Sequence, residues 1–242
     1  MSAGDSWIAA FPIRPAAEAV DALCEGWRIL AAMHRPHFNR KTKEPDITRA
    51  LKTYVECVVA RERGLLGMWA AEAVQNEMDF QTGALIEERR TDIIYGWNDE
   101  ETAIQLVFEF KKLNRLARSR TQYLGENGLR RFVTGRYSRG QPVAAMVGVL
   151  IDPEDQVVPP LRAALAEAGT IDALRLHVRP DGSVLDQPSQ LFSAADFDTE
   201  HERDEDLAPS HGTIRVAHLF LAFGYSAPRR RPGPPNSRPA KS

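Results

Sequence analysis

Two acidic residues and a lysine stand where two neighbouring strands are expected. Asp92 is followed, after sixteen residues, by Glu109, and Lys111 comes two positions later. A polar turn sequence at 98–101 lies between them and predicts a β-hairpin, with Asp92 on the first strand and Glu109 on the second. Because alternate residues of a strand point to the same face, Glu109 and Lys111 share a face that Asp92 can also reach.

These side chains suit the hydrolysis of a phosphodiester bond. Mg²⁺ is usually bound by one or two carboxylates together with water and phosphate oxygens, and Mn²⁺ favours the same kind of ligand. We therefore expect Asp92 and Glu109 to hold Mg²⁺ or Mn²⁺, which lowers the pKa of a bound water and offsets charge on the phosphate. Lys111 would orient the attacking water or help to deprotonate it, and would offset charge on the scissile phosphate.

The same residues also have a purely structural explanation. Asp92 would then be a strand-end residue, and Glu109 and Lys111 would form a solvated pair on one face of a strand. However, Glu109 lies between Phe108 and Phe110 in a strand that is otherwise largely apolar. Burial of an unpaired carboxylate is costly, so these neighbours favour a glutamate that is paired or bound to a metal.

The order Asp92, sixteen residues, apolar-Glu109-apolar-Lys111 resembles the PD-(D/E)XK nuclease superfamily, with Thr91 in the place of the proline. This resemblance implies a restriction-endonuclease-like αβββαβ core over about residues 46–151. It also implies a metal-dependent nuclease, with a role in bacterial defence or restriction.

Sites of this superfamily often include a third acid from the helix before the hairpin. Glu44 and Glu77 are our candidates for this additional metal ligand, ahead of Glu56. The alternative for each of them is an ordinary surface glutamate.

The segment after the hairpin carries a strong positive charge. Between residues 111 and 140, nine lysines and arginines stand against a single acid, Glu126, and apolar residues are interleaved with them. This pattern predicts a helix on the sheet whose basic outer face binds phosphates, with a solvated face as the alternative. The candidate nucleic-acid contacts are Lys112, Arg115, Arg118, Arg130 and Arg131. Gln122 and Tyr123 join them because they resemble substrate-positioning residues of exonuclease-like members of the superfamily.

The apolar patterns around these residues indicate an α/β fold with a mixed central β-sheet flanked by helices. Helices are expected at 16–33, from about 46 to 64, and at 161–168 after a Pro-Pro stop. Strands are expected at 84–97, 103–110, 143–151, 174–179 and 214–223, and residues 65–76 fit either a helix or a strand. We divide the chain into an N-terminal helical region at 1–45, a nuclease-like domain at 46–226, and a disordered basic, Pro-rich tail at 227–242.

The formal charge of −2 over 242 residues would by itself argue against a nucleic-acid partner. The total conceals a separation of charge, since residues 196–206 hold seven acids and one arginine whereas the tail holds five bases. We interpret 196–206 as a solvated acidic loop, and a cover over the basic face is the alternative.

Other features of the sequence bear on the location of the protein and on its cysteines and histidines. The sequence contains no run of about 18 apolar residues and no secretory leader, so we expect a cytoplasmic protein without a membrane partner. Cys24 and Cys57 are expected to be buried free thiols. His34 and His37 are expected at the surface, with a phosphate contact at most.

Together these observations predict a Mg²⁺-dependent nuclease that acts on nucleic acid, on DNA before RNA. A homodimer, or a partner protein from a defence system, would fit this prediction. Two alternatives stay open. One is a catalytically inactive nucleic-acid-binding or structural subunit on the same fold, and the other is a ribonuclease or toxin.

Overall fold

The computed structural model describes the chain except residues 1–6, 8–10, 79–80, 83–84, 99–102 and 226–242. In the described part, six strands form one mixed sheet in the order β1-β2-β3-β4-β6-β5. Strands β1 to β3 form an antiparallel meander, β3, β4 and β6 run parallel, and β5 pairs antiparallel with β6. The strands are β1 (Met68–Met78), β2 (Leu85–Asn98), β3 (Ala103–Leu113), β4 (Val143–Leu150), β5 (Phe197–Glu202) and β6 (Thr213–Ala222).

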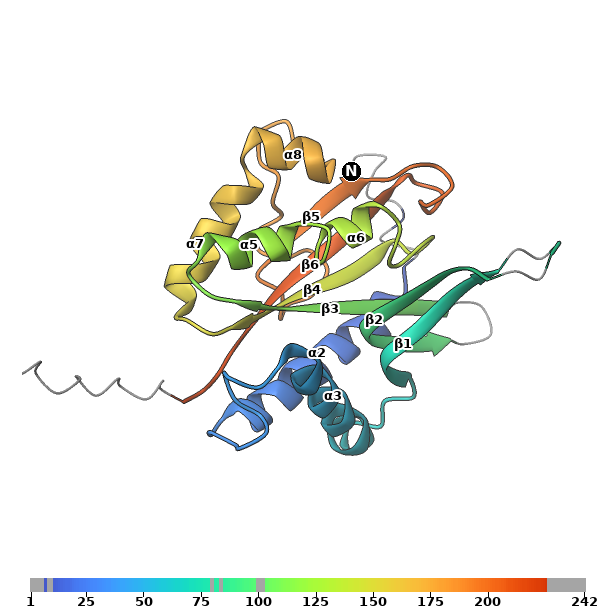
Figure 1. Cartoon of the computed structure of the whole chain (residues 1–242). Helices are drawn as coiled ribbons and strands as arrows, with labels where there is room; N and C mark the ends of the chain where they lie inside the picture. Colours follow the sequence, from blue (N-terminus) through green and yellow to red (C-terminus); the bar gives the residue numbers. More distant parts are fainter. Residues whose placement is uncertain (1–6, 8–10, 79–80, 83–84, 99–102, 226–242) are drawn as a thin grey trace, which may run out of the picture.

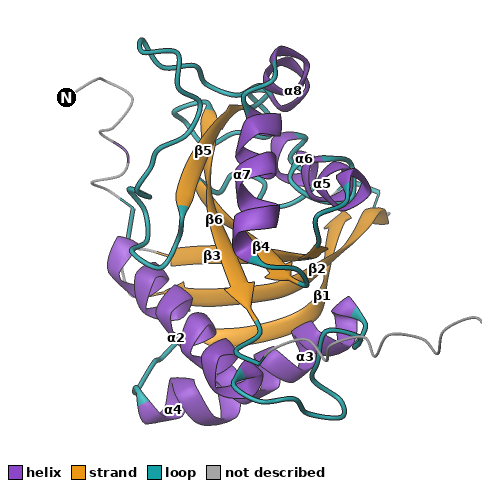
Figure 2. Cartoon of the chain, turned by 90° about the vertical axis from the view of Figure 1, so that its left-hand side faces the viewer, coloured by secondary structure: helices purple, strands orange, loops and turns teal. Residues whose placement is uncertain are grey.

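Helices cover both faces of this sheet, as Figures 1 and 2 show. One face carries α2 (Ile13–Ala31), α3 (Glu44–Tyr54), the π-helical turn η2 (Val55–Val59) and α4 (Ala60–Glu62). The other face carries α5 (Ala117–Leu124), α6 (Arg130–Val133), α7 (Glu154–Leu165) and α8 (Ala168–Leu174). The predicted α/β class with a mixed, helix-flanked sheet is therefore confirmed.

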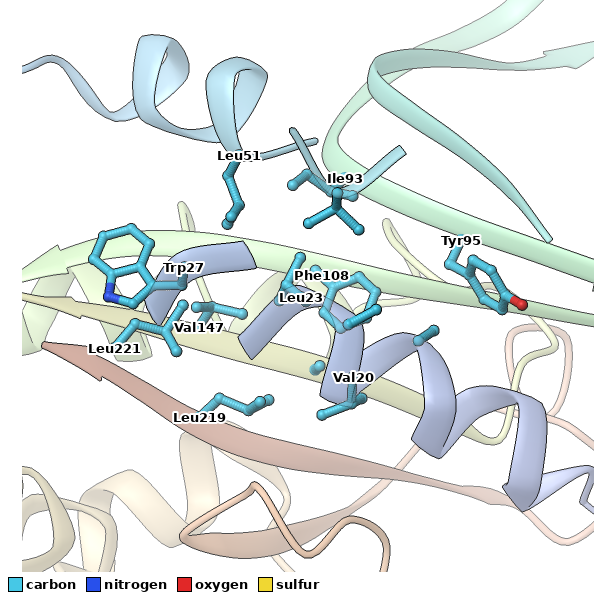
Figure 3. Close-up of a cluster of buried hydrophobic side chains, with 14 of the residues drawn as sticks. Val20, Leu23, Trp27, Leu51, Ile93, Tyr95, Phe108, Val147, Leu219 and Leu221 are labelled. Carbon is cyan, nitrogen blue, oxygen red and sulfur yellow. The ribbon is translucent and has the colours of Figure 1, made fainter. Parts of the chain in front are cut away.

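The larger core lies between the sheet and α2 with α3. Leu23 and Trp27 of α2 are buried one turn apart, and Figure 3 shows them over Phe108 of β3 and Val147 of β4. This spacing forms an apolar stripe that a helix can bury against a sheet. Helix α2 thus shares one core with the strands of the predicted domain at 46–226, although it precedes residue 46.

The second core lies on the opposite face, beneath α5, α6 and α7. Phe132 and Leu161 are fully buried there against Val107 and Val216, which belong to β3 and β6. Because both faces of the central strands are covered, β4 is buried along its whole length. This explains its continuous apolar run.

Helix α7 differs from the prediction. It begins at Glu154 and continues through Pro159 and Pro160, where a stop was expected. Each proline removes one backbone hydrogen bond from the helix. Burial of Val157 and Leu161 against the sheet compensates for that loss.

The expectations for three other segments need correction. Residues 196–206 are a solvated loop only in part: 197–202 form edge strand β5, in which Phe197, Asp198, Thr199 and His201 are buried, whereas the acids at 204–206 are exposed. Residues 174–179 form no strand; Leu176 makes only an isolated bridge to β5. Cys57 is exposed, and Cys24 is partly buried.

The ambiguous segment 65–76 is resolved as a strand, since β1 begins at Met68. No helix of the described residues is long and apolar enough to cross a membrane. The tail at 227–242 lies outside the described residues.

Candidate active site

The site lies where β2 and β3 separate. The two strands pair from Asn98 opposite Ala103 to Ile93 opposite Phe108, and the pairing ends there. Asp92 and Glu109 are the next residues in this register, so both side chains leave the same face of the sheet. The predicted hairpin is confirmed, and it brings the two carboxylates to the fork between its strands.

Where β3 no longer pairs with β2, two carboxylates accept hydrogen bonds from the backbone N–H groups of β3. The Phe110 N–H donates to Asp92 Oδ2 at 2.8 Å, and the Lys112 N–H donates to Glu44 Oε2 at 2.8 Å. Backbone N–H groups need such partners when the strand pairing ends. The two N–H groups are two residues apart on β3 and point to the same edge, so Asp92 and Glu44 lie side by side there.

Glu44 reaches the site because it begins helix α3. It stands in the first helical turn, followed directly by Pro45. Proline suits this position, and a carboxylate there is stabilised by the free N–H groups of the helix start. The structure thus brings one of the two candidate third acids to the site.

The other acids lie elsewhere. Glu77 pairs with Glu87 in the β1–β2 hairpin, five residues before Asp92, which is roughly 16 Å along an extended strand. Its side chain is outside the described residues. Glu56 lies in η2 and pairs with Lys52 at 2.6 Å.

A distortion of β1 adjoins the fork. Thr91 pairs with Ala73 and Ile93 with Ala71, which leaves Glu72 beside Asp92 with a positive φ of 49°. The Glu72 carboxylate lies 3.5 Å from Arg49 of α3. This ion pair links β1 to α3, the helix that begins with Glu44.

Lys111 is surrounded by three oxygen atoms. Its Nζ lies 2.8 Å from Glu109 Oε1, 3.1 Å from Glu44 Oε1 and 2.6 Å from the Phe110 carbonyl oxygen. Burial lowers the pKa of Lys111, but the charges of Glu109, Glu44 and Asp92 outweigh burial and raise it above its usual value. The ammonium is therefore kept protonated in an oxygen-lined cage.

Glu109 is the most deeply buried of these groups, with 1% of its side chain exposed. Its Oε1 contacts Lys111 and also Arg131 Nη1 at 3.4 Å. Its Oε2 is buried without a hydrogen-bond partner among the described residues. Burial, and then the charge of Asp92, raise the pKa of Glu109 to about 8 against the opposing effect of Lys111.

Asp92 has a similar environment. Burial raises its pKa, while the charge of Lys111 and the N–H of Phe110 oppose this effect. Two neighbouring carboxylates with raised pKa values are destabilised as anions, and a cation placed between them would relieve this cost.

Arg131 and Tyr137 close the site from the side of α6. Arg131 donates to the Tyr137 hydroxyl, and that hydroxyl donates to the Arg90 carbonyl oxygen. Burial, and then the charge of Glu109, raise the pKa of Tyr137 to about 12, so the hydroxyl stays neutral. Arg131 was expected on an outer basic face, but it turns inward to Glu109. No pattern in the sequence marks Tyr137.

The other predicted nucleic-acid contacts divide into two groups. Arg115, Arg118 and Gln122 are exposed along or just before α5, and their contact with nucleic acid stays a prediction. Arg130 is partly exposed and lies 3.0 Å from Glu126.

Lys112 and Tyr123 have internal roles instead. Lys112 Nζ donates to the Arg40 carbonyl at 2.6 Å and to the Thr42 carbonyl at 3.1 Å, so it holds the loop before α3. Tyr123 is fully buried, with its hydroxyl 2.9 Å from His218 Nδ1. Its assignment as a surface contact is wrong, because the aromatic ring forms the packed underside of α5.

Comparisons with known proteins provide no relative. No family model, no curated protein and no solved structure matches the chain. Among the described residues, no group of three or more His, Cys, Asp and Glu side chains has the arrangement of a metal site.

Proposed function

We propose that this protein is a metal-dependent nuclease that hydrolyses phosphodiester bonds, on DNA before RNA. The observation that carries the proposal is the buried Oε2 of Glu109 at the fork, which has no hydrogen-bond partner among the described residues, while Oε1 of the same carboxylate contacts the Lys111 ammonium. A buried carboxylate oxygen without a hydrogen bond is costly, and a bound cation would satisfy it.

The carboxylate oxygens of Asp92 and Glu109 are ligands of the type that Mg²⁺ or Mn²⁺ takes, and these two residues would hold the ion. Glu44 is a third carboxylate, within reach of the same lysine. Because the described residues do not converge as a group of three metal ligands, water and phosphate oxygens would complete the coordination. When bound, the ion would activate a water molecule and neutralise charge on the phosphate.

The protein side chains divide the remaining tasks. Lys111 stays protonated, so it acts as a positive charge beside the scissile phosphate rather than as the base. Arg131 and Tyr137 hold Glu109 in place, and Tyr137 anchors this arrangement on the backbone of β2.

The order of elements supports the proposal. Helix α3, three antiparallel strands, helix α5 with α6, and the parallel strand β4 follow the αβββαβ order of the PD-(D/E)XK nucleases. We extend the proposal to a role in bacterial defence or restriction, alone, as a homodimer or with a partner protein.

A test compares wild type with Lys111→Ala and Glu109→Gln on plasmid, linear single-stranded DNA and RNA. Each substrate is incubated with Mg²⁺, Mn²⁺ or EDTA. We expect metal-dependent cleavage of DNA by wild type and its loss, by at least a hundredfold, in both variants. Glu56→Gln is the matched control, because it makes the same chemical change away from the fork. Cleavage in EDTA, or full activity of Lys111→Ala, would refute the mechanism.

One observation favours a second candidate, a catalytically silent nucleic-acid-binding subunit. Lys111 already compensates Glu109 and Glu44 without a metal ion. In that case all three substrates would be bound but none cleaved. Preferential cleavage of RNA would instead support the ribonuclease alternative.

A further inference from the structure

A basic groove lies at the start of α3, the helix that brings Glu44 to the fork. It has a volume of about 840 Å³ and lies among the loop that joins α2 to α3, the first turns of α3, and Tyr225. Its basic lining residues are His34, His37, Arg40, Lys41, Lys43 and Arg49. The one acid of the lining, Asp46, is paired with Arg49 at 2.5 Å. We call this feature the loop groove.

The loop groove is built on the same strand as the site. Lys112, the residue after Lys111, holds the loop through the Arg40 and Thr42 carbonyls. The Arg40 guanidinium donates to the Tyr225 carbonyl at 2.9 Å and lies 5.4 Å from the Tyr225 ring centre. These contacts fix the shape of the groove before any ligand arrives, which lowers the entropic cost of binding.

Two cations of the groove are free to take a ligand. Lys41 and Lys43 are exposed, and neither side chain has an ion pair among the described residues. Glu44 follows Lys43 directly and contacts Lys111. Lys43 is thus the neighbour in the chain of a residue that contacts Lys111.

We propose that the loop groove binds the phosphate backbone of the nucleic-acid strand next to the scissile phosphate. This inference rests on the proposed function and extends it to a substrate track. The exposed Lys41 and Lys43, clustered with other basic side chains, favour a polyanion, and the rings of His34 and Tyr225, 5.5 Å apart, offer a surface for a base. The chain's own C-terminal tail does not fit, because residues 227–242 contain five bases and no acid.

The test measures binding of the full-length protein to fluorescent single- and double-stranded DNA by anisotropy, in EDTA and at several salt concentrations. The variant is Lys41→Ala/Lys43→Ala. The control is Arg28→Ala/Arg61→Ala, which removes two exposed positive charges of α2 and α4 outside the groove lining. Loss of two phosphate contacts should weaken binding about tenfold and reduce the slope of log K against log salt by about 1.4 to 1.8. The control should change neither by as much.

A groove variant that matches the control in affinity and salt slope would overturn the inference. The inference would also be overturned if Lys41→Ala/Lys43→Ala lost the binding of wild type to vesicles of 70% phosphatidylcholine and 30% phosphatidylserine but still bound DNA as wild type does. That result would assign the two lysines to a lipid surface. Because these measurements need no metal and no cleavage, they separate the two proposals. A protein that binds DNA through the groove but cleaves nothing would refute the nuclease and leave the groove as a nucleic-acid-binding site.

Discussion

Replacement of Glu109 by glutamine should stabilise the protein, and increasingly so as the pH rises. The pKa of Glu109 is raised from 4.5 to about 8 in the folded chain. Its ionisation is therefore easier in the unfolded chain than in the native one. Stability is fully retained below pH 4.5 and is lost as the pH rises towards 8, because the unfolded chain then binds fewer protons.

The expected magnitude follows from this shift. Between pH 4.5 and pH 7 the cost of the buried carboxyl reaches about 3 kcal/mol, because each pKa unit corresponds to about 1.4 kcal/mol. Glu109→Gln keeps the size of the side chain and cannot ionise. For a chain of this length, that gain corresponds to a rise in melting temperature of about 6–12 °C at pH 7.

The assay is urea unfolding, followed by tryptophan fluorescence, of wild type and Glu109→Gln in EDTA at pH 5, 6, 7 and 8. The free energies of unfolding should diverge steadily across this series. A constant difference would refute the reasoning, because it would mean that Lys111 keeps Glu109 ionised at every pH. Glu56→Gln controls for the exchange of a carboxylate for an amide.

Three further substitutions test other parts of the structure. Tyr123→Phe should leave His218 Nδ1 unpaired and lower the free energy of unfolding by about 1–3 kcal/mol, with DNA affinity unchanged in an anisotropy titration. His201 is buried as a neutral ring with its pKa lowered to about 4, chiefly by desolvation. His201 by itself should therefore destabilise the protein by about 2 kcal/mol between pH 7 and pH 5, so the free energy of unfolding of wild type relative to His201→Gln should fall by that amount in urea unfolding. Glu44→Gln should weaken Mn²⁺ binding in calorimetry at least tenfold and leave the secondary structure, followed by circular dichroism, intact.

The grouping of Asp92, Glu109 and Lys111 at the fork could be predicted from the sequence because it depends on local spacing. Glu109 and Lys111 share a face through the period of a strand, and Asp92 comes opposite Glu109 through the hairpin. The mixed sheet also followed from local patterns, since apolar runs with short turns allow few other arrangements. These features involve residues close together in the chain.

The sequence did not predict strand β5, because its pattern depends on contacts with residues that are not its neighbours in a hairpin. Asp198 lies in the interior, where it accepts hydrogen bonds from Ser189, Gln190 and Leu191. An acid in this segment normally predicts exposure, and only the loop that folds over it supplies the donors. Arg162 similarly pairs with Asp196 at 2.5 Å.

The sequence by itself determined which residue types meet in the hairpin, because backbone periodicity decides that without reference to the rest of the chain. Only the tertiary structure decided that Glu44 rather than Glu77 joins them, that Lys112 holds a loop, and that Tyr123 faces inward. Each of these outcomes depends on how a helix lies on the sheet, and that is decided by the total burial of two large cores. The pKa of Glu109 follows from the same packing, because desolvation depends on every neighbour that excludes water.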